Sequence, residues 1–226
     1  MYFVSKPIIT NGLVMYLDAG NKASYTSGSS VWNDLSGNNN SGSLQNNPGY
    51  NSANGGSIVF DGSNDYVTLG NNSIANITSV NNFTVSIWLL RSVDGSGIGV
   101  VHKGPITGTD YDWMVYLGGT NSVQFYKKNT SNTGAAVTGF NIDLNIIVNI
   151  SIVLSSDLVY FYKNGILVSS SSLPGDIRTS SDPFKIGRGW DGSFDGKIYN
   201  TQIYNRALSL SEVQQNFNTL KGRYGL

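Results

Sequence analysis

FTVSIWLL, residues 83–90, alternates apolar and polar side chains over most of its length. One face of the segment consists of Phe83, Val85, Ile87 and Leu89, and the other consists of Thr84, Ser86 and Trp88. Successive side chains of an extended chain point to opposite sides, so this period of two predicts a β-strand with one face in a core.

Short apolar segments of the same kind recur along the chain, at residues 13–17, 57–60, 66–69, 99–102, 112–117, 123–127, 146–154, 159–162, 166–169, 184–187 and 197–204. Asn164-Gly165 separates two of them, and this dipeptide accepts the left-handed backbone of a two-residue hairpin. Turn signals every ~8–12 residues, without strand–helix alternation, are typical of a sandwich or barrel. We therefore predict an all-β fold, a two-sheet antiparallel jelly-roll β-sandwich.

A single helix is expected near the C-terminus. Ser209 and Glu212 have the spacing of a capping box. Apolar residues at helical spacing follow, and Gly222 can end the helix. No interior linker is evident, so we expect an N-terminal arm over residues 1–10 and one sandwich domain over residues 11–226.

The composition excludes several classes of function. Net charge is zero and only 12% of residues are charged, so no basic surface for nucleic acid is expected. The chain has no cysteine, which excludes disulfides and thiolate metal sites. No apolar stretch approaches the ~20 residues of a membrane span, and MYFVSKPIIT lacks the pattern of a signal peptide. We expect no membrane insertion.

Residues 20–56 form a long polar stretch that contains one aromatic anchor, Trp32. A loop of this length in a compact domain is usually functional or packed on itself. The chain as a whole is rich in Gly, Asn and Ser. Such residues suit surfaces that meet sugars, but short loops alone also demand them.

Six motifs, in order, carry a family resemblance: GLVMYLDAG (12–20), WNDLSGN (32–38), SIVFDGSNDYV (57–67), FTVSIWL (83–89), FYKNGILV (161–168) and FDGKIYNTQIYNRALS (194–209). Together they resemble laminin-G-like domains of the concanavalin A-like lectin/glucanase superfamily. The opening segment YLDAGN (16–21) and the closing segment LKGRYGL (220–226) look most like those of phage virion proteins. The resemblance implies a jelly roll whose first and last regions pair, and it leaves function open, because this fold hosts lectins, adhesion modules, hydrolases and structural domains.

Hydrolysis is not expected. Glucanases of the family carry two glutamates on one strand, whereas Glu212 is the only glutamate here. Asp110 and Asp112 are the closest alternative pair of carboxylates, since an extended segment places them on one face. The only histidine, His102, is expected to be structural. We therefore predict that the chain is not an enzyme.

A calcium site is one interpretation of the turn Asp61-Gly-Ser-Asn64-Asp65, which offers three oxygen-bearing side chains. Related domains often add an acid after an isoleucine of the last strand, but Tyr199 stands there in this chain. The other interpretation is a hairpin closed by Asx-turns. Asp191 with Asp195 is a second acidic cluster, in the loop 190–196.

Carbohydrate sites combine an aromatic face with a few fixed polar groups. Two segments of the sequence offer both: Tyr111, Asp112 and Trp113, and Arg188, Trp190 and Asp191. Trp88 and Trp32 are expected to be buried, in the core and under the long loop. Trp190 lies between two glycines, so it is the preferred stacking residue, although a loop aromatic can equally cap an end of the sandwich.

The predicted function is non-catalytic recognition of a glycan or cell-surface receptor, by a protein of a virion or an extracellular surface. Several copies per particle would strengthen attachment. The alternative is a virion decoration or assembly protein, a homo-oligomer that contacts other virion proteins, with residues 1–10 as a docking segment.

Overall fold

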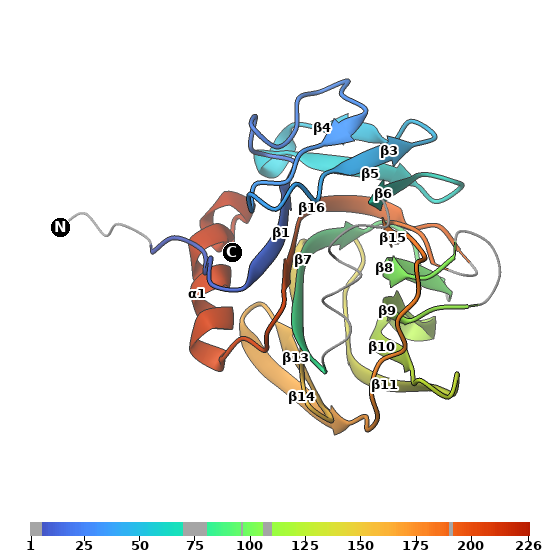
Figure 1. Ribbon diagram of the computed structural model, residues 1–226. Coiled ribbons are helices and arrows are strands. Elements are labelled where there is room, and N and C mark those ends of the chain that lie inside the picture. Colours follow the sequence, from blue (N-terminus) through green and yellow to red (C-terminus); the bar gives the residue numbers. More distant parts are fainter. Residues whose placement is uncertain (1–5, 70–80, 96, 106–109, 190–191) are drawn as a thin grey trace.

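The structure is a computed structural model that describes residues 6–69, 81–95, 97–105, 110–189 and 192–226. It is a sandwich of two antiparallel sheets (Figure 1). Sheet A contains, in order, β14 (Ile166–Ser172), β13 (Leu158–Lys163), β12 (Val148–Ser155), β7 (Asn82–Arg91), β16 (Asp195–Tyr204), β5 (Ser57–Asp61) and β4 (Gly49–Asn51), with β1 (Leu13–Asp18) paired to β16. Sheet B contains β11 (Gly134–Asn141), β10 (Ser122–Lys128), β9 (Trp113–Leu117), β8 (Ile98–Lys103), β15 (Phe184–Ile186), β6 (Tyr66–Leu69), β3 (Gly42–Gln45) and β2 (Val31–Trp32). The predicted fold class is confirmed.

The core lies between the two sheets and follows the alternation of the sequence. The apolar face of β7, from Phe83 to Leu89, points into it, and the exposed fraction of each of these side chains is 1% or less. Trp32 of β2 is also buried there, which anchors the long polar stretch as expected.

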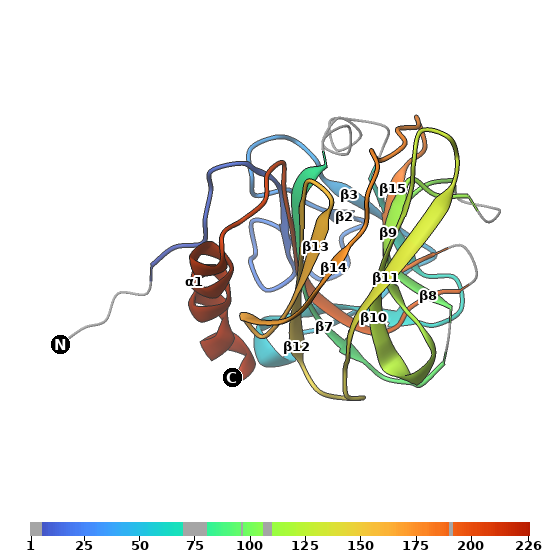
Figure 2. The same cartoon turned by 90° about the horizontal axis from the view of Figure 1, so that it is seen from below.

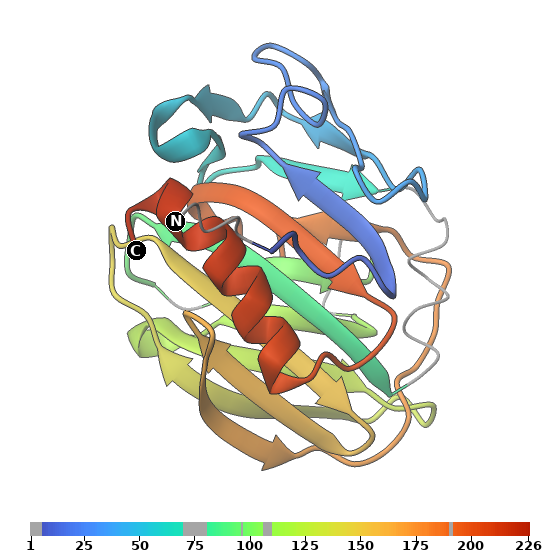
Figure 3. The same cartoon turned by 90° about the vertical axis from the view of Figure 1, so that its left-hand side faces the viewer.

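The outer face of sheet A carries the helix α1 (Leu210–Leu220), which runs across the strands in Figure 3. Figure 2 shows the helix, sheet A and sheet B as three layers. Trp88 leaves β7 on this outer face and stacks on Phe217, with ring centroids 5.5 Å apart and planes 3° from parallel. The helix therefore gives Trp88 a buried position away from the main core. No helix in the described ranges has the length and apolar character needed to cross a membrane.

The predicted capping box is present, because the Ser209 hydroxyl accepts from the Glu212 amide and the Glu212 carboxylate accepts from the Ser209 amide. Gly222 does not end the helix. α1 stops at Leu220, and a 3₁₀ turn (Lys221–Tyr224) carries the chain past Gly222.

The end of the expected N-terminal arm packs on this helix. The Ile9 amide donates to Asn216 Oδ1 at 2.8 Å, and the Thr219 hydroxyl donates to the Lys6 carbonyl at 2.6 Å. From Lys6 onward, this segment is thus engaged within its own chain, which argues against these residues as a docking segment.

Two predicted turns have different outcomes. Asn164 and Gly165 have φ of 52° and 75°, which confirms the tight hairpin between β13 and β14. The strands on either side of Asp61–Asp65 do not form a hairpin, because β5 pairs in sheet A and β6 pairs in sheet B. The chain crosses between the sheets at this corner, which the alternation within each strand does not reveal.

Four strands were not expected from the sequence: β2, β3, β4 and β11. The first three are short segments of the long polar stretch, and β11 is an edge strand with mostly exposed side chains. Each strand places only one or two apolar side chains on the core, so periodicity gives little signal there.

Candidate functional site

Trp113, expected at the ligand surface, is a core residue. It lies on the inner face of β9 with no exposed surface, against Phe83 at 5.0 Å and Phe184 at 5.7 Å between ring centroids. The start of β9 follows directly from the loop that carries Asp110 and Tyr111, so the sequence alone did not show which of these side chains turned inward. A ring without exposed surface offers no face to a sugar, and the prediction for Trp113 is therefore corrected.

Asp112 belongs to a buried ionic network instead of a binding surface. Its carboxylate accepts from Arg178 Nε at 3.0 Å and from the Ser180 hydroxyl at 2.7 Å, and Lys103 Nζ lies 3.8 Å away. The side chain is completely buried. These bonds fix the segment before β15 to sheet B, which is a structural role.

Asp110, the other carboxylate considered for catalysis, is paired with Lys128 Nζ at 2.5 Å and with Arg178 Nη1 at 2.9 Å. The hydrogen bond from Lys128 lowers the pKa of Asp110 to about 2. A glycosidase needs one carboxylic acid that keeps its proton near neutral pH. Neither Asp110 nor Asp112 is placed to be that acid.

His102 is not placed for catalysis either. Its ring is fully buried, and burial together with Lys185 lowers its pKa to about 3. The side chain is therefore neutral and sealed from substrate, as the sequence analysis expected of a structural histidine.

Tyr111 and Arg188 each contact the ring of a tyrosine side chain. The Tyr111 ring meets Tyr126 edge to face at 6.1 Å, and Lys128 Nζ lies 5.1 Å from its centroid. The Arg188 guanidinium lies over Tyr66, 5.4 Å from the ring centroid. Trp190 and Asp191 lie outside the described residues, so the predicted ligand set as a whole is not brought together in the described part of the chain.

The possible calcium ligands Asp61, Asn64 and Asp65 lie at the corner between β5 and β6. The Asp61 amide donates to the Asp65 carboxylate at 3.3 Å, and the Ser63 amide donates to Asp61 Oδ1 at 2.8 Å. Burial and the nearby Asp61 charge raise the pKa of Asp65. Three or more acidic or histidine side chains grouped to hold a metal ion are not found among the described residues, so calcium stays a prediction.

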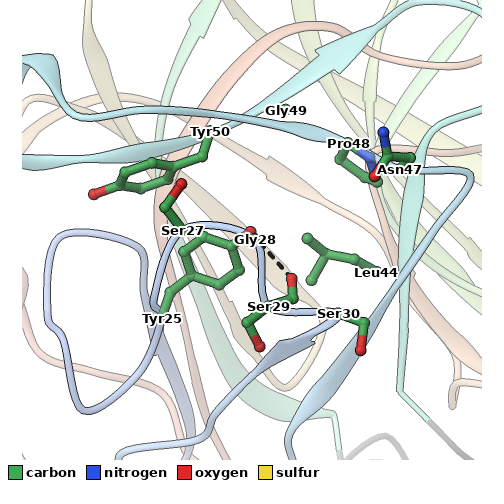
Figure 4. Close-up of a pocket in the computed structure, with 10 residues that line it drawn as sticks. All are labelled: Tyr25, Ser27, Gly28, Ser29, Ser30, Leu44, Asn47, Pro48, Gly49 and Tyr50. Carbon is green, nitrogen blue, oxygen red and sulfur yellow. Dashed lines mark hydrogen bonds between the residues drawn. The ribbon is translucent and has the colours of Figure 1, made fainter.

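A pocket of about 340 Å³ lies where the long polar stretch 20–56 joins the edges of the two sheets (Figure 4). The stretch supplies β2 and β3 to sheet B and β4 to sheet A. The lining residues are Tyr25, Ser27, Gly28, Ser29, Ser30, Leu44, Asn47, Pro48, Gly49 and Tyr50. We call this the Tyr25–Tyr50 pocket.

Two tyrosine rings form one side of this pocket. Tyr25 and Tyr50 are tilted by 40° with ring centroids 5.3 Å apart. Tyr25 is buried and its hydroxyl donates to the Ser29 carbonyl at 3.1 Å, whereas Tyr50 is only half-buried. Burial raises the pKa of the Tyr25 phenol. Tyr50 therefore offers an accessible aromatic surface that Tyr25 holds from behind.

In the polar part of the lining, hydrogen bonds fix the backbone, and several side chains are exposed to solvent. The Leu44 amide donates to the Ser30 carbonyl at 2.8 Å, and the Ser29 hydroxyl donates to the Val31 carbonyl at 2.9 Å. The side chains of Ser27, Ser30 and Asn47 are exposed. Hydroxyl and amide groups like these donate and accept hydrogen bonds. Chemically, the pocket combines a ring face with uncharged hydrogen-bonding groups.

The sequence did not single out these lining residues as candidate binding groups. The available signal was the length of the polar stretch 20–56, which favoured a functional or self-packed loop. The stretch turns out to be self-packed and also to enclose a cavity. No tryptophan marks that cavity, and its two tyrosines come from different ends of the stretch.

The profile of the concanavalin A-like lectin/glucanase superfamily, in its laminin G branch, matches residues 61–214. The chain belongs to this superfamily. No curated protein sequence matches it significantly.

Solved structures with the same fold share little sequence with the chain. The binding domain of Paraclostridial Mosquitocidal Protein 1 has a TM-score of 0.73 at 19% identity, over 92% of this chain and 52% of that one. Domain 4 of AbnA, an extracellular arabinanase from Geobacillus stearothermophilus, in complex with arabinotriose, has a TM-score of 0.70 at 18% identity, over 90% and 97%. The binding domain of botulinum neurotoxin serotype D has a TM-score of 0.71 at 14% identity, over 92% and 52%. The chain thus spans about half the length of the mosquitocidal-protein and neurotoxin binding domains.

Proposed function

We propose that this chain is a non-catalytic carbohydrate-recognition module that binds a glycan in the Tyr25–Tyr50 pocket. The observation that carries this proposal is the pairing of an accessible tyrosine ring with exposed hydroxyl and amide groups in one cavity. Sugar rings stack their C–H faces on aromatic rings and hydrogen-bond through their hydroxyls, so both parts of the lining match the ligand.

The described residues that glycoside hydrolysis would use are engaged in other contacts. Glu212 is committed to the helix cap and to Arg206, whose Nη2 lies 2.6 Å from its carboxylate. The carboxylates of Asp110 and Asp112 both form ion pairs with Arg178. The pocket itself is lined by no acidic residue. Among these described groups, none forms the acid-and-base pair that glycoside hydrolysis requires.

The similar solved structures are consistent with such a role. One is a domain of an extracellular arabinanase in complex with arabinotriose, and the other two are the binding domains of a mosquitocidal protein and of a botulinum neurotoxin. We extend the proposal to attachment at a cell surface, with the chain as part of a virion or another extracellular structure. A single small pocket gives modest affinity, and several copies per particle would turn it into firm attachment.

A glycan array probed with the purified protein tests this function. The Tyr50→Ala variant removes the accessible ring, and Tyr160→Ala, a half-buried tyrosine beside α1, is the matched control. Binding that survives in the control and is lost in Tyr50→Ala would support the pocket. Because truncation of Tyr50 also removes some packing, Asn47→Gly serves as a second variant that removes an exposed amide, since glycine adopts the φ of 71° at this position without strain.

Assembly is the second candidate function, favoured by the exposed apolar hairpin of β13 and β14. The exposed fraction is 65% for Ile166, 44% for Leu167 and 44% for Val168. β14 is also an edge strand of sheet A, and such edges can pair with another chain. Concentration-dependent mass measurements in solution test this candidate. Self-association that Leu167→Lys abolishes would support it, and a monomer at all concentrations would count against a homo-oligomer.

Calcium at the Asp61–Asp65 corner remains a separate proposal. An added cation would relieve the repulsion that Asp61 exerts on Asp65 and would raise the melting temperature. A calcium titration of wild type and Asp65→Asn tests it. An unchanged melting temperature in the wild type would refute the proposal.

A further inference from the structure

We propose that the Tyr25–Tyr50 pocket selects the uncharged end of a glycan and rejects the same glycan capped with an acidic sugar, without help from calcium. This inference rests on the proposed carbohydrate-binding function and names the class of ligand for that site. It follows from three properties of the pocket: the charge of its lining, the engagement of a neighbouring cation, and its size and rigidity.

The lining carries no charge. All ten lining residues are serine, glycine, tyrosine, asparagine, proline or leucine. A carboxylate that enters such a site loses water without gaining a cationic partner, and an unpaired charge is costly to desolvate. Since no carboxylate lines the pocket either, a calcium ion has no anionic side chain there to hold it beside an acidic sugar.

One cation at the same end of the sandwich, Arg223, is already paired. Arg223 packs against Gly55, close to the end of β4, and its Nη1 lies 2.7 Å from Asp18 Oδ1 and 2.8 Å from Asp18 Oδ2. The Asp18 side chain is buried, so Arg223 would leave an unpaired charge in the protein if it turned toward a ligand. Arg223 is therefore not available to bind an acidic ligand in the pocket unless its ion pair with Asp18 breaks.

The pocket is small and its walls are pinned. A volume of about 340 Å³ is near the lower end of the ~300–1,000 Å³ range of ligand sites, which suits one end of a glycan chain. The backbone bonds from Leu44 to Ser30 and from Tyr25 to Asn21, 2.8 Å each, hold the lining segments in place. A rigid site binds with a smaller entropic cost and has less freedom to recruit a distant charge.

A charge-swap experiment on the full chain tests this inference. Ser30→Lys places an ammonium group at the pocket, and Ser43→Lys places one on β3 outside the lining. Ser30 is preferred to Asn47 for this change, because Asn47 has a φ of 71° that a lysine would adopt only with strain. The probes are neutral oligosaccharides and their sialylated counterparts with the same core, in calcium and in chelator.

The wild type should bind at least one neutral glycan in both buffers and bind its sialylated counterpart at least about tenfold more weakly. Ser30→Lys should narrow or reverse that preference, while Ser43→Lys should leave it unchanged. Preference of the wild type for the sialylated glycan, loss of binding in chelator, or an equal effect of both lysines would overturn the inference and leave the proposed function standing. Silence toward every glycan, with a folded protein, would instead refute the proposed function itself.

Discussion

Arg223 and Asp18, 205 positions apart in the sequence, form a two-point ion pair in which Arg223 Nη1 contacts both carboxylate oxygens. The Tyr16 hydroxyl donates to Asp18 Oδ2 at 2.7 Å, and the Gly20 amide donates to Oδ1 at 3.0 Å. The end of β1 and the final 3₁₀ turn are thereby joined. The opening segment 16–21 and the closing segment 220–226 therefore contain the two halves of one contact, although Arg223 lies beyond the last of the six motifs, which ends at Ser209.

Arg223→Ala should destabilise the fold by about 2–3 kcal/mol, because it leaves the buried carboxylate of Asp18 without its cation. The remaining bonds from Tyr16 and Gly20 keep the loss from being larger. Urea unfolding measures the change. Asp143→Ala is the control, since Asp143 is 77% exposed at 3.8 Å from Lys163 and should contribute less than about 0.5 kcal/mol. Equal effects of the two substitutions would contradict the prediction.

Glu212 should make the stability depend on pH in the acidic range. Hydrogen bonds from Arg206 lower the pKa of Glu212 from 4.5 to about 2, so between these values the unfolded chain binds more protons than the folded chain. The stabilisation is complete above pH 4.5 and is lost as the pH falls toward 2. In denaturant titrations, the free energy of unfolding of Glu212→Gln should fall less between pH 4.5 and pH 2 than that of the wild type. An acid profile identical to that of the wild type would show that the Arg206 pair adds nothing.

Trp113→Ala should destabilise the protein by about 3–5 kcal/mol, because it empties a large volume between the sheets. The measurement is thermal or urea unfolding, with glycan binding followed in parallel on the folded fraction. As a core residue, Trp113 should affect binding only through the amount of folded protein. A variant that stays folded but loses glycan binding would contradict the prediction and indicate that Trp113 takes part in the binding site.

Trp190→Ala tests the ligand set that the sequence suggested. Under that hypothesis the variant loses glycan binding, whereas a ligand in the Tyr25–Tyr50 pocket depends on Tyr50 and Asn47. Array signals from Trp190→Ala and Tyr50→Ala, compared on one glycan, distinguish the two positions. Loss in both variants would indicate that the glycan engages two places on the chain.

Much of the fold could be predicted because a buried face requires apolar residues at regular spacing in the sequence. β7, the Asn164-Gly165 hairpin and the capped helix each combine a local signal with a role in the packed structure. The periodic pattern is weak where most side chains are exposed, as in β11, and it does not show where the chain changes sheet, as after Asp61.

The candidate site was harder to predict for a physical reason. Aromatic and acidic residues next to each other in sequence can end in different environments: Asp112, just before β9, joins an ionic network, whereas Trp113, the first residue of β9, enters the core. The pocket instead joins Tyr25 to Tyr50 through the pairing of short polar strands. Local composition carries no record of such pairing.

The position of β16 has a consequence for how the chain folds during synthesis. This strand lies between β7 and β5 in sheet A and also pairs with β1. Its three partner strands, β1, β5 and β7, are therefore synthesised first. Their hydrogen-bonding edges toward β16 stay unpaired until residues 195–204 leave the ribosome. Such long-range pairing slows folding and exposes nascent strands to aggregation. Translation that stalls before Asp195 should therefore yield a chain that depends on chaperones.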